Sequence, residues 1–161
     1  MDKIFLSLGS NLGDRAGHLA SGIEALKRTP GLAIRAVSPV YETMPAEGAA
    51  GGAFLNCSVK CSYDDGPLDL LKRLEAIERL EGRNSKGDYA ARPLDMDIIF
   101  FGNLVMNSQR LTVPHPRLYK RRFVLVPLND LDPHFRCPLI GKKVSELLAE
   151  TPDTADIVRI E

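Results

Sequence analysis

Hydrophobic and polar residues alternate along several stretches of the chain, and this period of two predicts β-strands. The clearest alternation lies in residues 4–8 and 54–63, and a similar pattern covers residues 32–42. Residues 94–101 form a mostly apolar run that is typical of a central strand, and residues 156–160 predict a last strand. Within 54–63 the alternation also predicts that two cysteines point into the core.

Apolar residues spaced three or four apart predict helices between these strands. One helix is expected from residue 16 to a stop at Pro30-Gly31. A second begins near Pro67 and ends near Gly82. Two more are expected near residues 121–130 and 143–150. Gly102-Asn103 predicts a hairpin turn that leads into a short strand at 104–106.

The resulting order, β-α-β-β-α-β-β-α-α-β, mixes strands and helices without strict alternation. This order favours the α+β class, with an antiparallel sheet and helices packed on it in three layers, α/β/α. The first six elements have the order of a ferredoxin-like unit. We expect one domain that spans residues 1–161.

Composition narrows the function classes. Of 161 residues, 44% are hydrophobic and 26% are charged, which is typical of a globular protein. The 21 basic and 21 acidic residues cancel, so the chain is not a generally basic nucleic-acid binder. No apolar run approaches the roughly 20 residues of a membrane span. The opening segment lacks the pattern of a secretory signal, and three cysteines do not make a disulfide framework, so we expect a cytoplasmic protein.

Asp95 and Asp97 are the strongest candidates for chemistry. Residues two apart on a strand share a face, so this strand presents two carboxylates together, about 6.6 Å apart at Cα. Two acids beside an apolar run repel each other and lose hydration, and a cation relieves both costs. Carboxylate oxygens suit Mg²⁺. The alternatives are two unrelated acids on a solvated edge, or acids paired with arginines.

Basic residues gather around these acids. Residues 83–122 carry 8 basic and 3 acidic side chains, whereas residues 1–82 carry 9 and 11 and residues 123–161 carry 4 and 7. Arginine forks bind phosphate oxygens, so carboxylates and guanidiniums together suit phosphoryl transfer. A basic run can equally be a solvated face or can bind nucleic acid.

Rival functions differ in the motifs they require. An RNA-binding module on a ferredoxin-like sheet needs an aromatic RNP1-type segment, which is absent here. A metal-dependent phosphatase or nucleotidyltransferase stays open, and it would release phosphate or pyrophosphate from ATP. The chain also lacks the phosphate loop and the dinucleotide fingerprint.

Several segments together resemble the 6-hydroxymethyl-7,8-dihydropterin pyrophosphokinase family of folate biosynthesis. The resemblance extends from residue 4 to about residue 130. It is carried by Gly9-Ser10-Asn11-Leu12-Gly13, Phe54-Leu55-Asn56, Arg92-Pro93-Leu94-Asp95-Met96-Asp97-Ile98, Arg110-Leu111-Thr112-Val113-Pro114-His115-Pro116, Arg121 and Phe123. The chain departs from the family pattern at Met44, Tyr89, Ala90-Ala91 and Pro116.

The resemblance implies a ferredoxin-like fold, transfer of pyrophosphate from ATP to the pterin hydroxymethyl group, and release of AMP. It implies that Asp95 and Asp97 hold two Mg²⁺ ions and that Arg83 and Arg92 stabilise the transferring group. The residues implied to contact ATP, the co-substrate, are Lys86, Ile98, Arg110, Thr112, His115 and Arg121. The residues implied to bind pterin are the rings of Phe54 and Phe123 together with Thr43 and Asn56. We expect a monomer that uses these small molecules and binds neither nucleic acid nor membrane.

Overall fold

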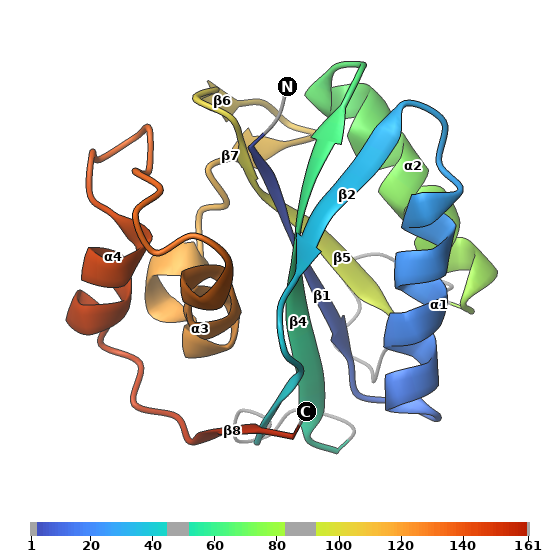
Figure 1. Ribbon diagram of the computed structural model, residues 1–161, viewed down its shortest axis with the longest axis horizontal. Helices are drawn as coiled ribbons and strands as arrows, with labels where there is room; N and C mark the ends of the chain where they lie inside the picture. Colours follow the sequence, from blue (N-terminus) through green and yellow to red (C-terminus); the bar gives the residue numbers. More distant parts are fainter. Residues whose placement is uncertain (1–2, 45–51, 83–92, 161) are drawn as a thin grey trace.

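The computed structural model describes residues 3–44, 52–82 and 93–160, which fold into a layered α+β structure (Figure 1). The strands are β1 (Ile4–Ser10), β2 (Leu32–Val37), β3 (Tyr41–Thr43), β4 (Phe54–Tyr63), β5 (Asp95–Phe101), β6 (Met106–Asn107), β7 (Thr112–Val113) and β8 (Ile157–Arg159). The helices are α1 (Arg15–Lys27), α2 (Pro67–Leu80), the 3-10 helix η1 (Leu118–Lys120), α3 (Arg122–Leu131) and α4 (Val144–Glu150).

The main sheet is antiparallel, with the order β5-β1-β4-β3-β8. Strand β4 is long enough to pair with β3 along its first residues and with β2 along its last ones. The order of β1, α1, β2, β4, α2 and β5 is that of the predicted ferredoxin-like unit. The expected α+β class is therefore confirmed.

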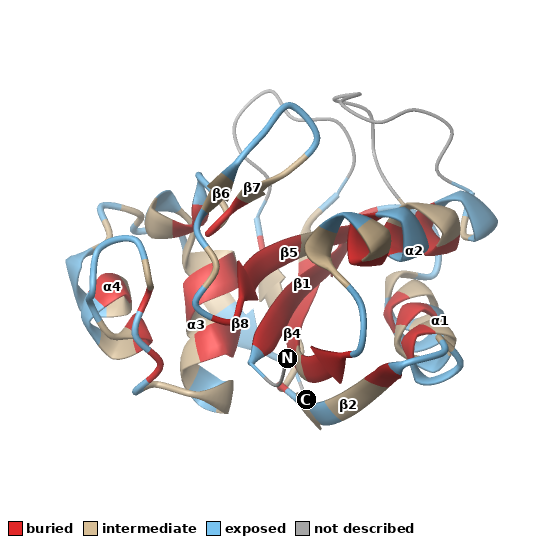
Figure 2. Ribbon diagram, turned by 90° about the horizontal axis from the view of Figure 1, so that it is seen from above, coloured by how far each residue is buried: buried red, intermediate tan, exposed pale blue. Residues whose placement is uncertain are grey.

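Helices cover both faces of the sheet, and a hydrophobic core lies on each side. Helices α1 and α2 lie on one face, and α3 and α4 lie on the other (Figures 1 and 2). Even-numbered residues of β1 and odd-numbered residues of β4, such as Leu8 and Cys57, pack into the first core. Phe5 and Phe100 pack with α3 and α4 in the second. The three-layer arrangement follows from strands that are apolar on both faces.

Two buried cysteines confirm the core predicted from the alternation of β4. Cys57 and Cys61 are at most 1% exposed, and burial raises the pKa of each thiol to about 12. Both side chains are therefore protonated hydrophobic residues at neutral pH.

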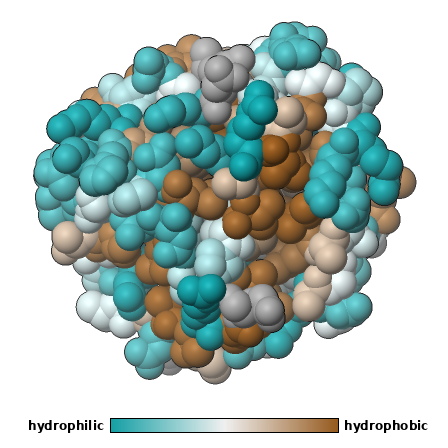
Figure 3. Space-filling model, viewed as in Figure 1, coloured by the Kyte–Doolittle hydropathy of each residue, from teal (hydrophilic) through white to brown (hydrophobic). Residues whose placement is uncertain are grey.

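Seen from the side of Figure 1, apolar residues form a surface band over the strands, with hydrophilic residues on both flanks (Figure 3).

Two sequence predictions of strands were wrong in detail. The expected strand at 32–42 is two strands, because Ser38 and Pro39 interrupt the pairing and Ser38 Oγ instead accepts a hydrogen bond from the Ser58 N–H at 2.8 Å. The expected hairpin from β5 does not form. A turn exists at Gly102, but β6 pairs with β7 rather than returning along β5.

Among the described residues, none of the helices combines the length and apolar character that crossing a membrane requires.

Candidate active site

Polar side chains gather on one face of the sheet, beyond the part that α3 and α4 cover. Asp95 on β5 pairs with Gly9 on β1, and Gly9 pairs with Asn56 on β4. Adjacent strands lie about 4.8 Å apart, so about 10 Å separates the backbones of Asp95 and Asn56. Asp97 shares the face of Asp95, whereas Met96 between them is buried in the opposite core. The register thus brings two carboxylates and an amide onto one face, as the strand pattern predicted for the carboxylates.

Gly9 is needed for the close approach of Asn56. A Cβ atom at position 9 would lie 2.6 Å from Asn56 Nδ2 and 3.6 Å from the Phe54 ring. The Asn56 amide is 4% exposed, and its Nδ2 donates a long hydrogen bond of 3.4 Å to the Leu8 carbonyl. Asn56 Oδ1 has no hydrogen-bond partner in the part of the chain that the structure describes. A buried acceptor without a partner is costly, so this oxygen is suited to a ligand that donates.

Glu78 is a residue of this region that the sequence analysis missed. It lies on α2, is 2% exposed, and its Oε2 accepts a hydrogen bond of 2.8 Å from the Met96 N–H. Met96 stands between the two aspartates on β5, which is an edge strand of the sheet among the described residues, and its N–H bonds to Glu78 rather than to another strand. Glu78 continues the apolar stripe of α2, one turn after Leu74. A carboxylate on an apolar stripe is the sequence feature that could have identified it.

His115 lies beside the edge of β5 as a neutral ring. Its backbone N–H donates to the Ile99 carbonyl at 2.9 Å, which fixes the loop to the strand. Burial, followed by the charges of Arg121 and Arg117, lowers the pKa of His115 to about 4, although Asp95 acts in the opposite direction. Nδ1 accepts the Arg117 N–H at 3.1 Å, so the ring proton is assigned to Nε2. His115 therefore presents an N–H donor at neutral pH.

The lowered pKa of His115 predicts a loss of stability at acid pH. The unfolded chain binds a proton on this ring below its usual pKa of 6.5, whereas the folded chain does so only near pH 4. The contribution of the neutral ring to the free energy of unfolding is therefore fully present above pH 6.5. It is lost as the pH falls toward 4, by at most about 3 kcal/mol. Urea unfolding in EDTA, between pH 7 and 4, measures the difference in the free energy of unfolding between wild type and His115→Asn. We expect this difference to shift in favour of His115→Asn as the pH falls, because only wild type carries the ring that resists protonation. The side-chain oxygen of asparagine can still accept the Arg117 N–H. A difference that stays constant with pH, or that grows in favour of wild type at low pH, would contradict the assigned neutral ring.

A cavity of about 240 Å³ beside β5 joins several residues that the resemblance assigned to ATP. Its lining includes Asp97 and the predicted ATP contacts Ile98, Arg110, Thr112 and His115. Arg110 Nη2 lies 3.3 Å from Glu75 Oε1, an exposed ion pair that ties this arginine to α2. The Thr112 hydroxyl donates to Asn107 Oδ1 at 3.1 Å. The cavity thus combines apolar side chains of β5, next to Asp97, with mostly polar side chains of the β6–β7 segment.

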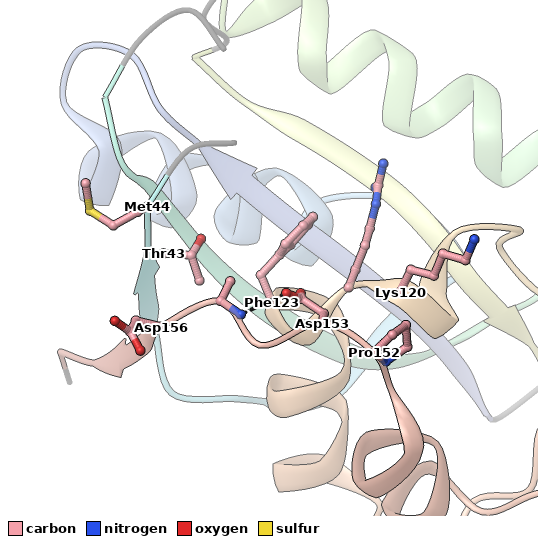
Figure 4. Close-up of a pocket in the computed structure, with 9 residues that line it drawn as sticks. Thr43, Met44, Lys120, Phe123, Pro152, Asp153 and Asp156 are labelled. Atoms are coloured by element: carbon pink, nitrogen blue, oxygen red, sulfur yellow. Dashed lines mark hydrogen bonds between the residues drawn. The ribbon is translucent and has the colours of Figure 1, made fainter. Parts of the chain in front are cut away.

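A second cavity, of about 570 Å³, lies between β3 and the start of α3 (Figure 4). Its lining includes Thr43, Arg121 and Phe123, all of which the sequence singled out. The Arg121 guanidinium carbon lies 5.3 Å from the centre of the Phe123 ring, within cation–π range. Pro152, Asp153, Ala155 and Asp156 complete this wall, and the sequence analysis missed all four. No local pattern indicates them, because the contact joins segments about 30 positions apart.

Three of the predicted site residues lie outside the described residues. These are Arg83 and Arg92, expected to stabilise the transferring group, and Lys86, expected to contact ATP. Phe54 and Asn56 lie at the start of β4 on the same face as Asp95. Phe123 is on the first turn of α3, which packs over this face.

The carboxylate pair fits magnesium better than a metal that needs a full set of protein ligands. Asp95 and Asp97 supply hard oxygen donors, and both are only partly buried. Within the described ranges, no cluster of three or more His, Cys, Asp or Glu side chains could hold a metal ion. Mg²⁺ commonly takes one or two carboxylates and completes its octahedron with water and substrate phosphates. The residues present therefore fit this ion.

Fold and site together are typical of one class, the α+β enzymes that transfer phosphoryl or diphosphoryl groups. The family model described as 7,8-dihydro-6-hydroxymethylpterin-pyrophosphokinase (HPPK) matches residues 5–133. A 2-amino-4-hydroxy-6-hydroxymethyldihydropteridine pyrophosphokinase of Pseudomonas aeruginosa is 38% identical over 152 residues, which cover 94% of this chain and 93% of the relative. The protein of the same name from Aquifex aeolicus is 33% identical over 93% of this chain and 92% of its own. The chain therefore belongs to the 7,8-dihydro-6-hydroxymethylpterin-pyrophosphokinase family.

Other relatives are much longer than this chain. A mitochondrial folate synthesis bifunctional protein of Arabidopsis thaliana is 40% identical over 80% of this chain but only 23% of its own length. Among solved structures, the HPPK-DHPS protein of Plasmodium falciparum with pteroate superposes with a TM-score of 0.73 at 16% identity, over 92% of this chain and 42% of that one. The structural likeness supports the fold alone.

Proposed function

We propose that the protein transfers the β- and γ-phosphates of ATP, as one diphosphate group, to the hydroxymethyl oxygen of 6-hydroxymethyl-7,8-dihydropterin in folate biosynthesis. Membership of the pyrophosphokinase family supports the reaction. The observation that carries the proposal in the structure is one sheet face that joins the Asp95–Asp97 pair to the buried amide of Asn56. The carboxylate pair suits a metal-bound triphosphate, and the Asn56 amide suits a flat heterocycle with N–H donors.

The pterin is assigned to the Asn56 end of this face. A pterin ring presents N–H and NH₂ donors on one edge, and Asn56 Oδ1 is a buried acceptor that lacks a partner among the described residues. Phe54 and Phe123 provide aromatic surface for the two ring faces. The Thr43 side chain, 6% exposed, lies beside Phe54 across the β3–β4 pairing and supplies a further hydroxyl.

ATP is assigned to the edge of β5. The His115 Nε2–H and the guanidiniums of Arg110 and Arg121 can donate to phosphate oxygens. The neutral His115 ring donates without adding a charge that Arg121 and Arg117 would repel. Ile98 contributes apolar lining to the neighbouring cavity, where Thr112 adds a hydroxyl. Lys86 is assigned to the same nucleotide, and Arg83 and Arg92 to the transferring group, from the sequence resemblance.

Asp95 and Asp97 are assigned as the ligands of magnesium, for which we expect two ions. Bound magnesium would neutralise charge on the triphosphate. The chain itself holds the two substrates on one rigid sheet face, which lowers the entropic cost of bringing them together.

The bonds exchanged define the products. The hydroxymethyl oxygen of the pterin forms a bond to the β-phosphorus. The bond between that phosphorus and the oxygen bridging to the α-phosphate breaks, and AMP leaves with the electron pair. The hydroxyl proton passes to solvent. Among the described residues that line the two cavities, His115 is held as a donor and is not assigned as a base.

The setting of the reaction is also proposed. We expect residues 1–161 to act as one pyrophosphokinase domain, as a cytoplasmic monomer that binds neither nucleic acid nor membrane. The absence of an RNP1-type segment from the sequence supports the view that the substrates are small molecules.

The test of this function is pterin-dependent formation of AMP. The protein is incubated with MgATP, with and without the reduced hydroxymethylpterin, and AMP, ADP, phosphate and pyrophosphate are quantified. We expect AMP only when the pterin is present, in equal amount to the diphosphorylated pterin. AMP with free pyrophosphate would favour a nucleotidyltransferase, and ADP with free phosphate would favour a phosphatase.

A further inference from the structure

The C-terminal segment, residues 151–159, closes one side of the cavity between β3 and α3. It runs from the end of α4 past the first turn of α3 to β8, which pairs with β3 (Figures 1 and 4). The family model ends at residue 133, so this segment lies outside it.

Asp153 supplies the N-terminal cap that α3 lacks. The residue before the helix is Arg121, whose side chain makes no capping hydrogen bond. The carboxylate Oδ2 of Asp153 instead accepts the Arg122 N–H at 2.8 Å. A carboxylate at a helix N-terminus satisfies a free N–H group and interacts favourably with the helix dipole. The capped residue stands between Arg121 and Phe123, both of which the proposed function uses.

Further hydrogen bonds hold Asp153 in place. Its Oδ1 accepts the Ala155 N–H at 2.9 Å, and its own N–H donates to Thr151 Oγ1 at 3.3 Å. The Thr151 hydroxyl donates to the Tyr119 carbonyl at 2.7 Å, and Arg122 Nη1 donates to the Ala155 carbonyl at 2.6 Å. The segment is thus fastened to both sides of the junction between η1 and α3.

The other end of the segment is fastened to the opposite wall. In β8, Ile157 pairs with Thr43 and Arg159 pairs with Tyr41. The Ile160 N–H donates to the Val40 carbonyl at 3.0 Å. One continuous segment therefore connects the helix that carries Phe123 with the strand that carries Thr43, and it sets the distance between these two walls of the cavity.

We propose that Asp153 is a positioning residue for the pterin site. By capping α3, Asp153 fixes the first turn of the helix. The first turn in turn sets the position of the Phe123 ring, over which the Arg121 guanidinium lies. Asp153 does not touch the reacting atoms and acts through Phe123. The inference rests on the proposed assignment of Phe123 to pterin binding.

The test measures pterin binding in a double-mutant cycle. Pterin dissociation constants are measured by fluorescence in the presence of a non-hydrolysable ATP analogue and Mg²⁺, well below the melting temperature. The variants are Asp153→Ala and Phe123→Ala, singly and together. Asp153→Ala is expected to weaken pterin binding about 5- to 10-fold in wild type and less than twofold in the Phe123→Ala background.

Two matched variants separate positioning from general effects. Asp153→Asn keeps an oxygen that can accept the Arg122 N–H and is expected to restore binding to within about twofold of wild type. Glu24→Ala removes an exposed carboxylate on α1, outside this cavity, and is expected to bind pterin normally. If Asp153→Ala does not fold, Asp153→Glu, which displaces the carboxylate by one methylene, is expected to weaken binding instead.

The outcomes distinguish failure of the inference from failure of the proposed site. Equal weakening by Asp153→Ala in both backgrounds, or unchanged binding in the folded single variant, would overturn the role of Asp153 while leaving the pterin site intact. Normal binding by Phe123→Ala would overturn the assignment of Phe123, and with it the inference. A wild-type protein that binds no pterin would contradict the proposed function itself.

Discussion

Asp97→Ala is expected to lower the rate of AMP formation by about 10²- to 10³-fold while leaving the fold intact. The substitution removes one of the two carboxylates assigned to magnesium and so one of the charges that hold a metal-bound triphosphate. It also removes the repulsion between Asp95 and Asp97 in the metal-free protein. The melting temperature in EDTA is therefore expected to stay within about 3 °C of wild type, or to rise.

A binding measurement separates metal loss from general damage. MgATP is expected to raise the melting temperature of wild type, because it binds the folded state, and to have little effect on Asp97→Ala. Glu24→Ala is the matched control, because it removes an exposed carboxylate on α1 that pairs only with Lys27, 3.3 Å away, among the contacts described. A large fall in the melting temperature of Asp97→Ala in EDTA, or turnover like that of wild type, would favour a structural role for the pair.

Gly9→Ala is expected to raise the KM for pterin at least about 10-fold while the KM for ATP changes little. The new methyl group would lie 2.6 Å from Asn56 Nδ2, so the amide must move. Asn56 is 4% exposed and has little room to move without changing its place on the sheet face. Overpacking of this kind commonly costs about 1–3 kcal/mol of stability, so binding is measured well below the melting temperature.

Gly66→Ala provides the control for Gly9→Ala. A Cβ atom at position 66 has no neighbour within 4 Å, and its backbone, with φ of −82°, accepts alanine. This variant is expected to keep both KM values. Parallel increases of the two KM values in Gly9→Ala would indicate a general distortion of β1 rather than displacement of the Asn56 amide.

Local patterns in the sequence predicted most of the ferredoxin-like unit, because its elements depend on nearby residues. One buried face of β4 was predicted from the alternation around Cys57 and Cys61. One buried face of α2 was predicted from its apolar stripe. The pairing of short strands was not predictable in this way. Met106 pairs with Val113 rather than with β5, and no feature of residues 102–106 distinguishes the two partners.

The site was predicted only in part for the same physical reason. Asp95 and Asp97 are two apart on one strand, so their common face follows from geometry. Asp153 caps a helix 31 positions earlier in the chain, and Glu78 reaches across to the Met96 N–H from another element. Such contacts arise from tertiary packing. Glu78 alone left a trace in the sequence, as an acid on an apolar stripe.

The most direct test of the reaction follows the phosphorus atoms of ATP. ³¹P NMR is recorded on a mixture of the protein, MgATP and the reduced hydroxymethylpterin, with ¹⁸O in the non-bridging oxygens of the ATP β-phosphate. Transfer of an intact diphosphate predicts a pterin product with two coupled phosphorus signals, of which the one bonded to the pterin oxygen carries the ¹⁸O shift, with one AMP formed for each product. A label that stays in ADP, or that is released as free pyrophosphate, would contradict diphosphate transfer to the pterin.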